Sequence, residues 1–244
     1  MTIEYPDWHL CHKKFQARYK TIIRAYRELV GRHSIHADKE YWSICGDCTD
    51  GRGNIAPVFE GEHGLVGSEA AQMVHAGLIT PSQFHGVELD ADIHRRNAEA
   101  NRDGFHFHHG DINRVMDIAS ANLRFNPEII NLDFPSGAKK ASEVVGNAFF
   151  TLTDGEFYDP HLVVVNIMKR VPHHAEQTIE EVIDFFASNS HFRYAWSNGW
   201  RETNPWKLDG RGCREGFTQP YIYKGTGGKA RTKMSTVIFY RRHT

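Results

Sequence analysis

The sequence predicts an α/β protein in which helices cover both faces of a mostly parallel β-sheet. From residue 41 onward, apolar segments of strand length alternate with segments of helical periodicity, which is typical of parallel strands joined by helices. Residues 128–132 (EIINL) are apolar enough for a central strand. The alternation ends near the C-terminus, where two strand-like segments follow each other without a helix. We therefore expect three layers and a C-terminal antiparallel strand pair.

The elements are expected in the following order along the chain. Strands are predicted at residues 41–46, 84–89, 105–109, 128–132, 161–167 and 192–196. Helices are predicted at residues 68–78, with Ser68 as the cap, 92–101 and 175–188. The antiparallel pair is predicted at residues 221–223 and 234–240, joined by the glycine-containing segment 224–228.

The N-terminal segment has a different character. Residues 9–30 carry apolar side chains at helical spacing and end before Gly31, which predicts an amphipathic helix. We interpret its basic residues as a solvated face, with phosphate contact as the alternative; they are Lys13, Lys14, Arg18, Lys20, Arg24 and Arg27. The character of the sequence changes near residues 31–40. This change divides an N-terminal helical extension, residues 1–35, from an α/β domain, residues 36–244.

Composition and charge narrow the class of protein. The chain has 244 residues, of which 40% are hydrophobic and 24% charged, as expected for one globular domain with an extension. It contains no apolar run near the roughly 20 residues that cross a bilayer, and its N-terminus does not resemble a secretory signal. We expect a cytoplasmic protein without a membrane partner. The formal net charge of -1 argues against binding nucleic acid through bulk charge.

Four cysteines are too few for a disulfide scaffold, so we interpret them as thiols; they are Cys11, Cys45, Cys48 and Cys213. Cys45 and Cys48 form a CxxC motif, but no second pair lies at metal-ligand spacing, so we expect no metal site. Zinc bound by these cysteines and nearby histidines is the alternative. The 16 histidines are scattered, and we expect most of them, including the cluster His106, His108 and His109, to be ordinary surface or packed residues.

Polar residues follow the first two predicted strands directly. In an open parallel sheet, ligands bind beyond the carboxyl ends of the strands, so these residues are candidates for a site. The first strand ends in Cys45-Gly46-Asp47, where the glycine permits close approach of a ligand to the backbone. The second ends in Glu88-Leu89, which offers a carboxylate to both hydroxyls of a ribose.

The third and fourth predicted strands end in the same manner. The third is followed by Asp111 and Ile112, which suit a hydrogen bond to an adenine amino group and packing on its ring. The fourth carries Asn131, Asp133 and Phe134, so an acid and an aromatic residue would lie beside the reactive end of the ligand.

Three segments, FHGVELDADIHRRN, HHGDINRVM and PEIINLDFPSG, resemble in order and spacing those of the class I (Rossmann-like) S-adenosylmethionine-dependent methyltransferases. The resemblance covers roughly residues 40–242 and includes the C-terminal antiparallel pair. It implies a Rossmann-like fold, S-adenosylmethionine as the cofactor and methyl transfer as the reaction.

The resemblance also implies roles for individual residues. Gly46 and Asp47 would line the methionine end of the cofactor, and Glu88 would bind its ribose. Asp111 would bind the adenine. For Glu88, Asp111 and Asp133 the alternative is a structural role, in which the carboxylate caps a helix or binds a turn. The full set implied for cofactor binding is Cys45, Gly46, Asp47, Glu88, Leu89, Asp111, Ile112 and Asn131, and the set implied for catalysis is Asp133 and Phe134.

The chain departs from the family pattern in two places. Residues 48–67 separate the first strand from the first helix, so the cofactor loop is either Gly46 or the series Gly61, Gly64 and Gly67; we favour Gly46 because it follows the better strand. The residues Asp133-Phe134-Pro135-Ser136 also differ from the Asp/Asn-Pro-Pro-aromatic tetrad of enzymes that methylate amino groups of nucleic acids. This difference weakens the case for base amino methylation.

The acceptor is expected to be a nucleic acid, contacted by the N-terminal helix and the loop 224–233. This loop and its surroundings combine basic and aromatic residues, namely Lys224, Lys229, Arg231, Lys233, Trp200, Trp206 and Tyr223. Residues 48–67 and 197–218 are expected to cover the site. A small-molecule acceptor and a non-catalytic nucleotide-binding or nucleic-acid-binding protein are the alternatives. A nicotinamide-dependent dehydrogenase is disfavoured because no compact GxGxxG follows the first strand.

Overall fold

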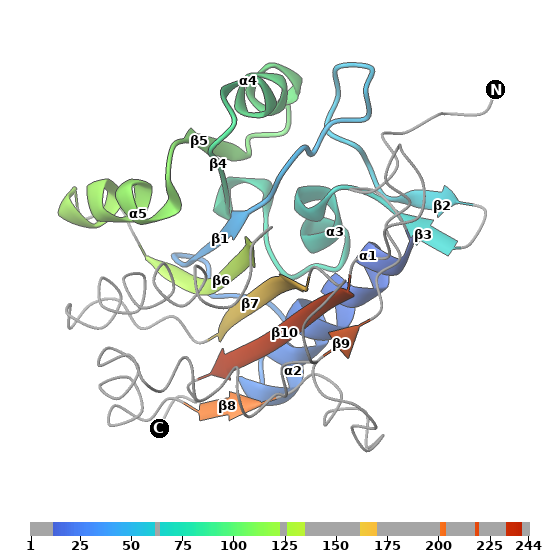
Figure 1. The fold of residues 1–244 in the computed structure, drawn as a ribbon, viewed down its shortest axis with the longest axis vertical. Helices are drawn as coiled ribbons and strands as arrows, with labels where there is room; N and C mark the ends of the chain where they lie inside the picture. The colour runs from blue at the N-terminus through green and yellow to red at the C-terminus, as the bar shows by residue number, and fades with distance from the viewer. Residues whose placement is uncertain are drawn as a thin grey trace.

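A computed structural model describes residues 12–61, 64–122, 126–134, 162–169, 201–203, 218–219 and 233–240. Within these ranges an eight-stranded sheet forms the centre of the molecule (Figure 1). The segments predicted at 175–188, 192–196 and 221–223 lie outside the described residues, as do Cys11, Cys213 and most of the loop 224–233.

The sheet has the order β5-β4-β1-β6-β7-β10-β8, and β9 pairs with β10. The bounds are β1 Glu40–Ile44, β4 Phe84–Glu88, β5 His106–His109, β6 Pro127–Phe134, β7 Leu162–Lys169, β8 Arg201–Thr203, β9 Thr218–Gln219 and β10 Lys233–Tyr240. Strands β5, β4, β1, β6 and β7 are parallel, whereas β10 runs antiparallel to β7, β8 and β9. The predicted mostly parallel sheet with an antiparallel C-terminal part is confirmed.

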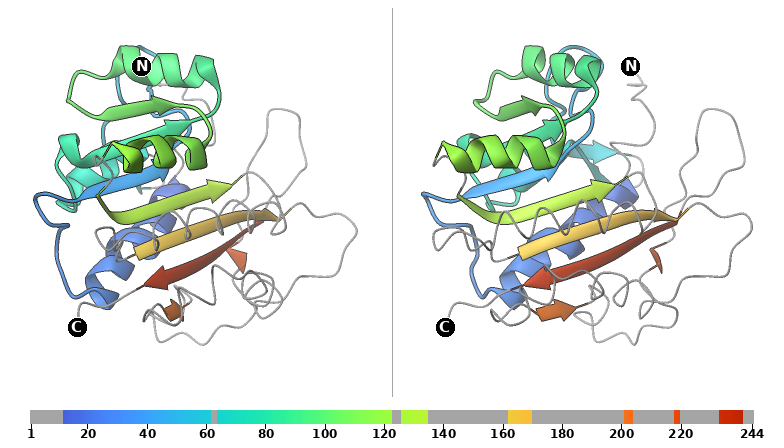
Figure 2. Two further views of the ribbon diagram at one scale, coloured as in Figure 1. Left: turned by 90° about the vertical axis from the view of Figure 1, so that its left-hand side faces the viewer. Right: turned by 60° about the vertical axis from the view of Figure 1, so that its left-hand side comes forward.

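Helices cover the two faces of the sheet, and a small hairpin lies apart from it. The helical bounds are α1 His12–Arg18, the π-helical η1 Tyr19–Arg24, α2 Ala25–Leu29, α3 Glu69–His75, the 3-10 helix η2 Pro81–Gln83, α4 Ala91–Ala100 and α5 Ile112–Ala121. The hairpin pairs β2, Phe59–Gly61, with β3, Gly64–Val66. Figure 2 shows α5 on one side of the sheet and the N-terminal helix on the other. Helix α5 was not predicted from the sequence.

The N-terminal helix contributes to the main hydrophobic core. Ile22, Ile23 and Tyr26 are 0% exposed and belong to the same buried cluster as Ile129 of β6. The Tyr26 hydroxyl also donates a hydrogen bond to Glu128, at the start of β6. The apolar stripe predicted for residues 9–30 therefore packs directly on the sheet. Among the described residues, no helix is long and apolar enough to span a membrane.

The solvated face predicted for the basic residues of this helix is wrong at two positions. Lys14 and Arg18 are only 8% and 5% exposed. Each lies against a carboxylate: the distance from Lys14 Nζ to Asp133 Oδ2 is 3.0 Å, and that from Arg18 Nε to Glu69 Oε2 is 3.4 Å. Burial of a charged side chain is tolerated when a partner of opposite charge is present.

Gly86 of β4 allows a close approach between neighbouring side chains. A Cβ atom at this position would lie 2.6 Å from Cys45 Sγ, 2.9 Å from Phe107 Cδ1 and 3.0 Å from Phe84 Cε1. The substitution Gly86→Ala is expected to lower the free energy of unfolding by about 1–3 kcal/mol, because overpacking a core forces its neighbours to move. Urea denaturation measures the loss. The double variant Gly86→Ala/Cys45→Ala should recover part of it, and an unchanged unfolding midpoint in Gly86→Ala would contradict the packing argument.

Candidate cofactor site

Four adjacent parallel strands bring most of the predicted site residues to one edge of the sheet. Ile44 of β1 pairs with Val87 of β4, and Glu88 pairs with His109 of β5. Strand β6 lies on the other side of β1. The turns after β1, β4 and β5 and the end of β6 therefore lie side by side, as expected for a ligand site at the carboxyl ends of parallel strands.

The loop after β1 is fastened to α4 by a buried amide. Asn97 is 0% exposed; its Nδ2 donates to the Gly46 carbonyl at 2.9 Å, and its Oδ1 accepts from the Cys48 backbone N–H at 2.9 Å. Gly46 has a φ of 65°, in the region that favours glycine. Asn97 was not predicted as a site residue, because its only signal in the sequence is a polar residue inside a helical pattern.

Asp47 is held by the protein itself. Its Oδ2 accepts hydrogen bonds from Arg96 Nε at 3.1 Å and Arg96 Nη2 at 2.8 Å, and its Oδ1 accepts from the Thr49 backbone N–H and hydroxyl. Burial raises the pKa of Asp47, but the hydrogen bonds from Thr49 and Arg96 outweigh burial and leave the pKa below its ordinary value. Asp47 is therefore ionised, and its hydrogen bonds to Arg96 hold the loop after β1 against α4.

Glu88 closes the turn between β4 and α4. Its Oε1 accepts from the Asp90 backbone N–H at 3.0 Å, and Asp90 in turn caps α4 through the N–H groups of Asp92 and Ile93. This hydrogen bond involves one of the two carboxylate oxygens of Glu88. Leu89, between the two acids, is 69% exposed.

Asp111 begins α5. Its Oδ1 accepts from the Asn113 backbone N–H at 2.9 Å, which is the hydrogen bond of a helix cap. The turn before it is joined to β4, because the Gly110 N–H donates to the Glu88 carbonyl at 3.0 Å. Asp111 is exposed and Ile112 is buried. The structure thus places Glu88 and Asp111 in neighbouring turns.

Asn131 lies below this edge, within a buried polar network. It is 1% exposed, and its Nδ2 donates to Ser43 Oγ at 3.2 Å and to Glu69 Oε1 at 3.0 Å. Its Oδ1 accepts from Asn166 Nδ2 at 3.1 Å. Protein partners therefore occupy both polar atoms of Asn131.

Asp133, two residues further along β6, is the acid paired with Lys14. Their side chains are 19% and 11% exposed, so the pair is largely shielded from water. Phe134 ends β6, and its side chain lies outside the described part of the structure. The contact of Lys14 with Asp133 was not predicted, because nothing near Lys14 in the sequence indicates that it meets β6.

Cys45 and Cys48 are buried free thiols. A hydrogen bond with Cys48, together with burial, raises the pKa of the Cys45 thiol well above its ordinary value, and such thiols are unreactive. Within the described ranges, no three His, Cys, Asp or Glu side chains are placed to hold a metal ion.

The glycines of the alternative cofactor loop, Gly61, Gly64 and Gly67, lie in the β2–β3 hairpin and in the loop ahead of α3. Gly61 ends β2 and Gly64 begins β3, and the two residues pair with each other in the β2–β3 hairpin. At Gly67, a Cβ atom would lie 3.0 Å from the Pro57 carbonyl oxygen, so this residue packs on the loop ahead of α3. Gly46, by contrast, follows β1 directly at the carboxyl edge of the sheet.

The strand order, with β10 antiparallel beside β7, defines a Rossmann-like α/β fold. No protein-family model matches the chain, and no curated protein matches it.

Solved structures similar to this chain include methyltransferases at low sequence identity. The fibrillarin pre-rRNA processing protein of Methanococcus jannaschii is 10% identical, with 91% of this chain and 76% of that chain covered and a TM-score of 0.38. SMU.776, a putative methyltransferase complexed with SAH, is 12% identical, with 88% and 48% covered and a TM-score of 0.40. An S-adenosylmethionine-dependent methyltransferase from Archaeoglobus fulgidus is 9% identical, with 94% and 97% covered and a TM-score of 0.40. The likeness concerns the fold.

Proposed function

We propose that this protein is an S-adenosylmethionine-dependent methyltransferase whose cofactor binds across the turns after β1, β4 and β5. The observation that carries the proposal is the alignment of Gly46, Glu88 and Asp111 at one sheet edge, with Glu88 and Asp111 joined through the Gly110 N–H. A glycine, an acid for a ribose and an acid for an adenine are the groups that an adenosine-containing cofactor requires.

The side chains fit such a ligand. Glu88 uses one oxygen for its own turn and Asp111 uses one for the cap of α5, so both carboxylates are oriented and each retains an oxygen for a ligand donor. Asp47 contributes indirectly, because its bonds to Arg96 fix the loop that carries Gly46. Preorganised groups of this kind lower the entropic cost of binding.

Bound S-adenosylmethionine would supply an electrophilic methyl group, and the protein would align the acceptor with it. Asp133 is the candidate to accept or hold a proton on the acceptor. Lys14 Nζ lies 3.0 Å from Asp133 Oδ2 and holds this carboxylate in place through an ion pair. We therefore assign Asp133 to the transfer site and Lys14 to its positioning.

Isothermal titration tests the cofactor assignment. The parent protein should bind S-adenosylmethionine and S-adenosylhomocysteine but not NAD. Glu88→Gln should weaken binding of both adenosyl ligands by about tenfold or more, the cost of losing a charge-assisted hydrogen bond. Glu99→Gln, on the exposed side of α4, is the matched control and should bind like the parent. Equal affinity of the parent and Glu88→Gln would refute this cofactor site.

The proposal also specifies the methyl acceptor, which we propose is a nucleic acid. It rests on the basic and aromatic sequence of residues 200–233. The N-terminal helix gives it less support than the sequence suggested, because Lys14 and Arg18 are buried in ion pairs. Incubation with S-adenosylmethionine labelled in its methyl group, followed by separate recovery of RNA, DNA and small molecules, identifies the acceptor class. Label in the small-molecule fraction alone would overturn the nucleic-acid assignment.

A further inference from the structure

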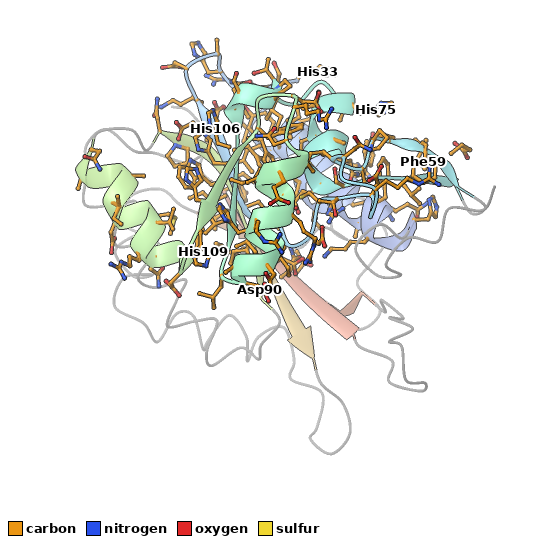
Figure 3. The ribbon with its side chains drawn as sticks, turned by 90° about the horizontal axis from the view of Figure 1, so that it is seen from above. His33, Phe59, His75, Asp90, His106 and His109 are labelled. Carbon is orange, nitrogen blue, oxygen red and sulfur yellow. The ribbon has the colours of Figure 1, made fainter. Side chains whose placement is uncertain are left out.

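A row of aromatic rings crosses three strands on the sheet face that α5 covers. The indole of Trp42 on β1 stacks on the imidazole of His85 on β4 with ring centres 4.6 Å apart. His85 in turn stacks on His106 and His108 of β5, at 4.7 Å and 5.3 Å. Figure 3 shows β5 beside α5, with His106 and His109 at its opposite ends.

The ring nitrogens of two of these imidazoles lie close together. His85 Nδ1 lies 3.0 Å from His108 Nε2, within hydrogen-bond distance, and His85 Nε2 lies 3.6 Å from Glu40 Oε1. We assign the proton of His85 to Nε2, the nitrogen that faces this carboxylate. In this tautomer His85 Nδ1 accepts the N–H of His108, and the Nδ1 atom of His108 is a hydrogen-bond acceptor.

A cavity of about 690 Å³ lies between this row and α5, within the range typical of small-molecule sites. The rings of Trp42, His85, His106 and His108 line one side. Aliphatic residues of α5, among them Ile118, line the other, and Ile118 is 54% exposed.

The charges of the lining select against anions. The described lining residues include the carboxylate of Glu40 and no lysine or arginine. Burial lowers the pKa of His85 to about 3, with further lowering by His108 and His106, so this ring is neutral near neutral pH. The site therefore suits a ligand without negative charge that can donate a hydrogen bond to nitrogen and present a flat face to aromatic and aliphatic groups.

We propose that the cavity under α5 is a second binding site, for a neutral nucleobase or nucleoside. A nucleobase is planar and carries N–H donors for His108, and the volume admits the attached sugar. A nucleotide is disfavoured because its phosphate would meet Glu40 without a cation among the described lining residues. This site lies on the α5 face, whereas Asp133 and Lys14 lie with α1 on the opposite face.

Titration of the full chain with adenosine, guanosine, cytidine and AMP tests the proposal. At least one nucleoside should bind, and AMP should bind about fivefold or more weakly than adenosine. Ile118→Arg should weaken nucleoside binding by about tenfold or more by blocking the cavity, and His108→Phe should weaken it by removing the acceptor. Tyr19→Arg, a similarly exposed position on the N-terminal helix, is the matched control and should leave binding unchanged.

The cavity reaches His109, at the end of β5 next to the proposed cofactor site, so the two sites need separate variants. Glu88→Gln should leave nucleoside binding intact while it weakens binding of S-adenosylmethionine. Nucleoside binding that is lost in Glu88→Gln but kept in Ile118→Arg would assign the nucleosides to the cofactor site and overturn the second site. Absence of binding by all three nucleosides at millimolar concentration, or detectable binding of AMP with the same affinity as adenosine, would also overturn it. Neither result would bear on the cofactor site.

Discussion

Replacing Glu69 by alanine is expected to lower the free energy of unfolding by about 3–5 kcal/mol, the cost of breaking a buried ion pair from one side. Glu69 is 1% exposed in the first turn of α3. Its Oε1 accepts from the Tyr41 hydroxyl at 2.6 Å, from Ser43 Oγ at 2.5 Å and from Asn131 Nδ2 at 3.0 Å. The alanine variant would leave these donors without their acceptor and the buried guanidinium of Arg18 without its carboxylate partner.

Urea denaturation of parent and variant measures this loss. Glu69→Gln keeps one carbonyl acceptor and should lose less stability than Glu69→Ala. The matched control is Glu99→Ala, which removes an exposed glutamate from α4 and should change stability by less than about 0.5 kcal/mol. If Glu69→Ala were as stable as Glu99→Ala, the buried network would contribute nothing to the stability of the fold.

Acidification is expected to destabilise the protein through His85, by up to about 1.4 kcal/mol per pH unit. Burial, followed by the neighbouring His108 and His106, lowers the pKa of His85 from 6.5 to about 3 in the folded protein, where its side chain is 12% exposed. Between these two pH values the unfolded chain binds a proton that the folded protein does not. The contribution is therefore fully present above pH 6.5 and is lost as the pH falls toward about 3.

Urea denaturation at a series of pH values between 7 and 5 tests this contribution. His85→Gln removes the ionisable group, so its stability should fall less steeply with decreasing pH than that of the parent. His33→Gln is the control, because His33 is exposed and lies away from the aromatic row (Figure 3). Identical slopes for the parent and His85→Gln would show that the folded protein accommodates the protonated ring.

The periodicity of the chain was enough to predict the sheet and the helices α3 and α4. The apolar runs of β1, β4, β6 and β7 and the cap at Ser68 occur where the sequence indicated, because side-chain periodicity and helix caps are local properties. Helix α5 follows β5 almost directly, and its cap Asp111 was interpreted first as an adenine ligand, with turn or cap chemistry as the alternative. In the proposed site Asp111 both caps α5 and binds the adenine. An acid at this position in the sequence therefore did not distinguish a helix start from a ligand-binding residue.

The sequence alone determined the fold class, the order of the strands along the chain and the acids that end them. Only the tertiary structure decided which charged groups meet: Lys14 with Asp133, Arg18 with Glu69, and Arg96 with Asp47. It also decided that histidines from two strands form one row with Trp42. The physical reason is that periodicity specifies which face of an element is buried, whereas ion pairs and stacked rings depend on strand order and register, which join residues far apart in the chain.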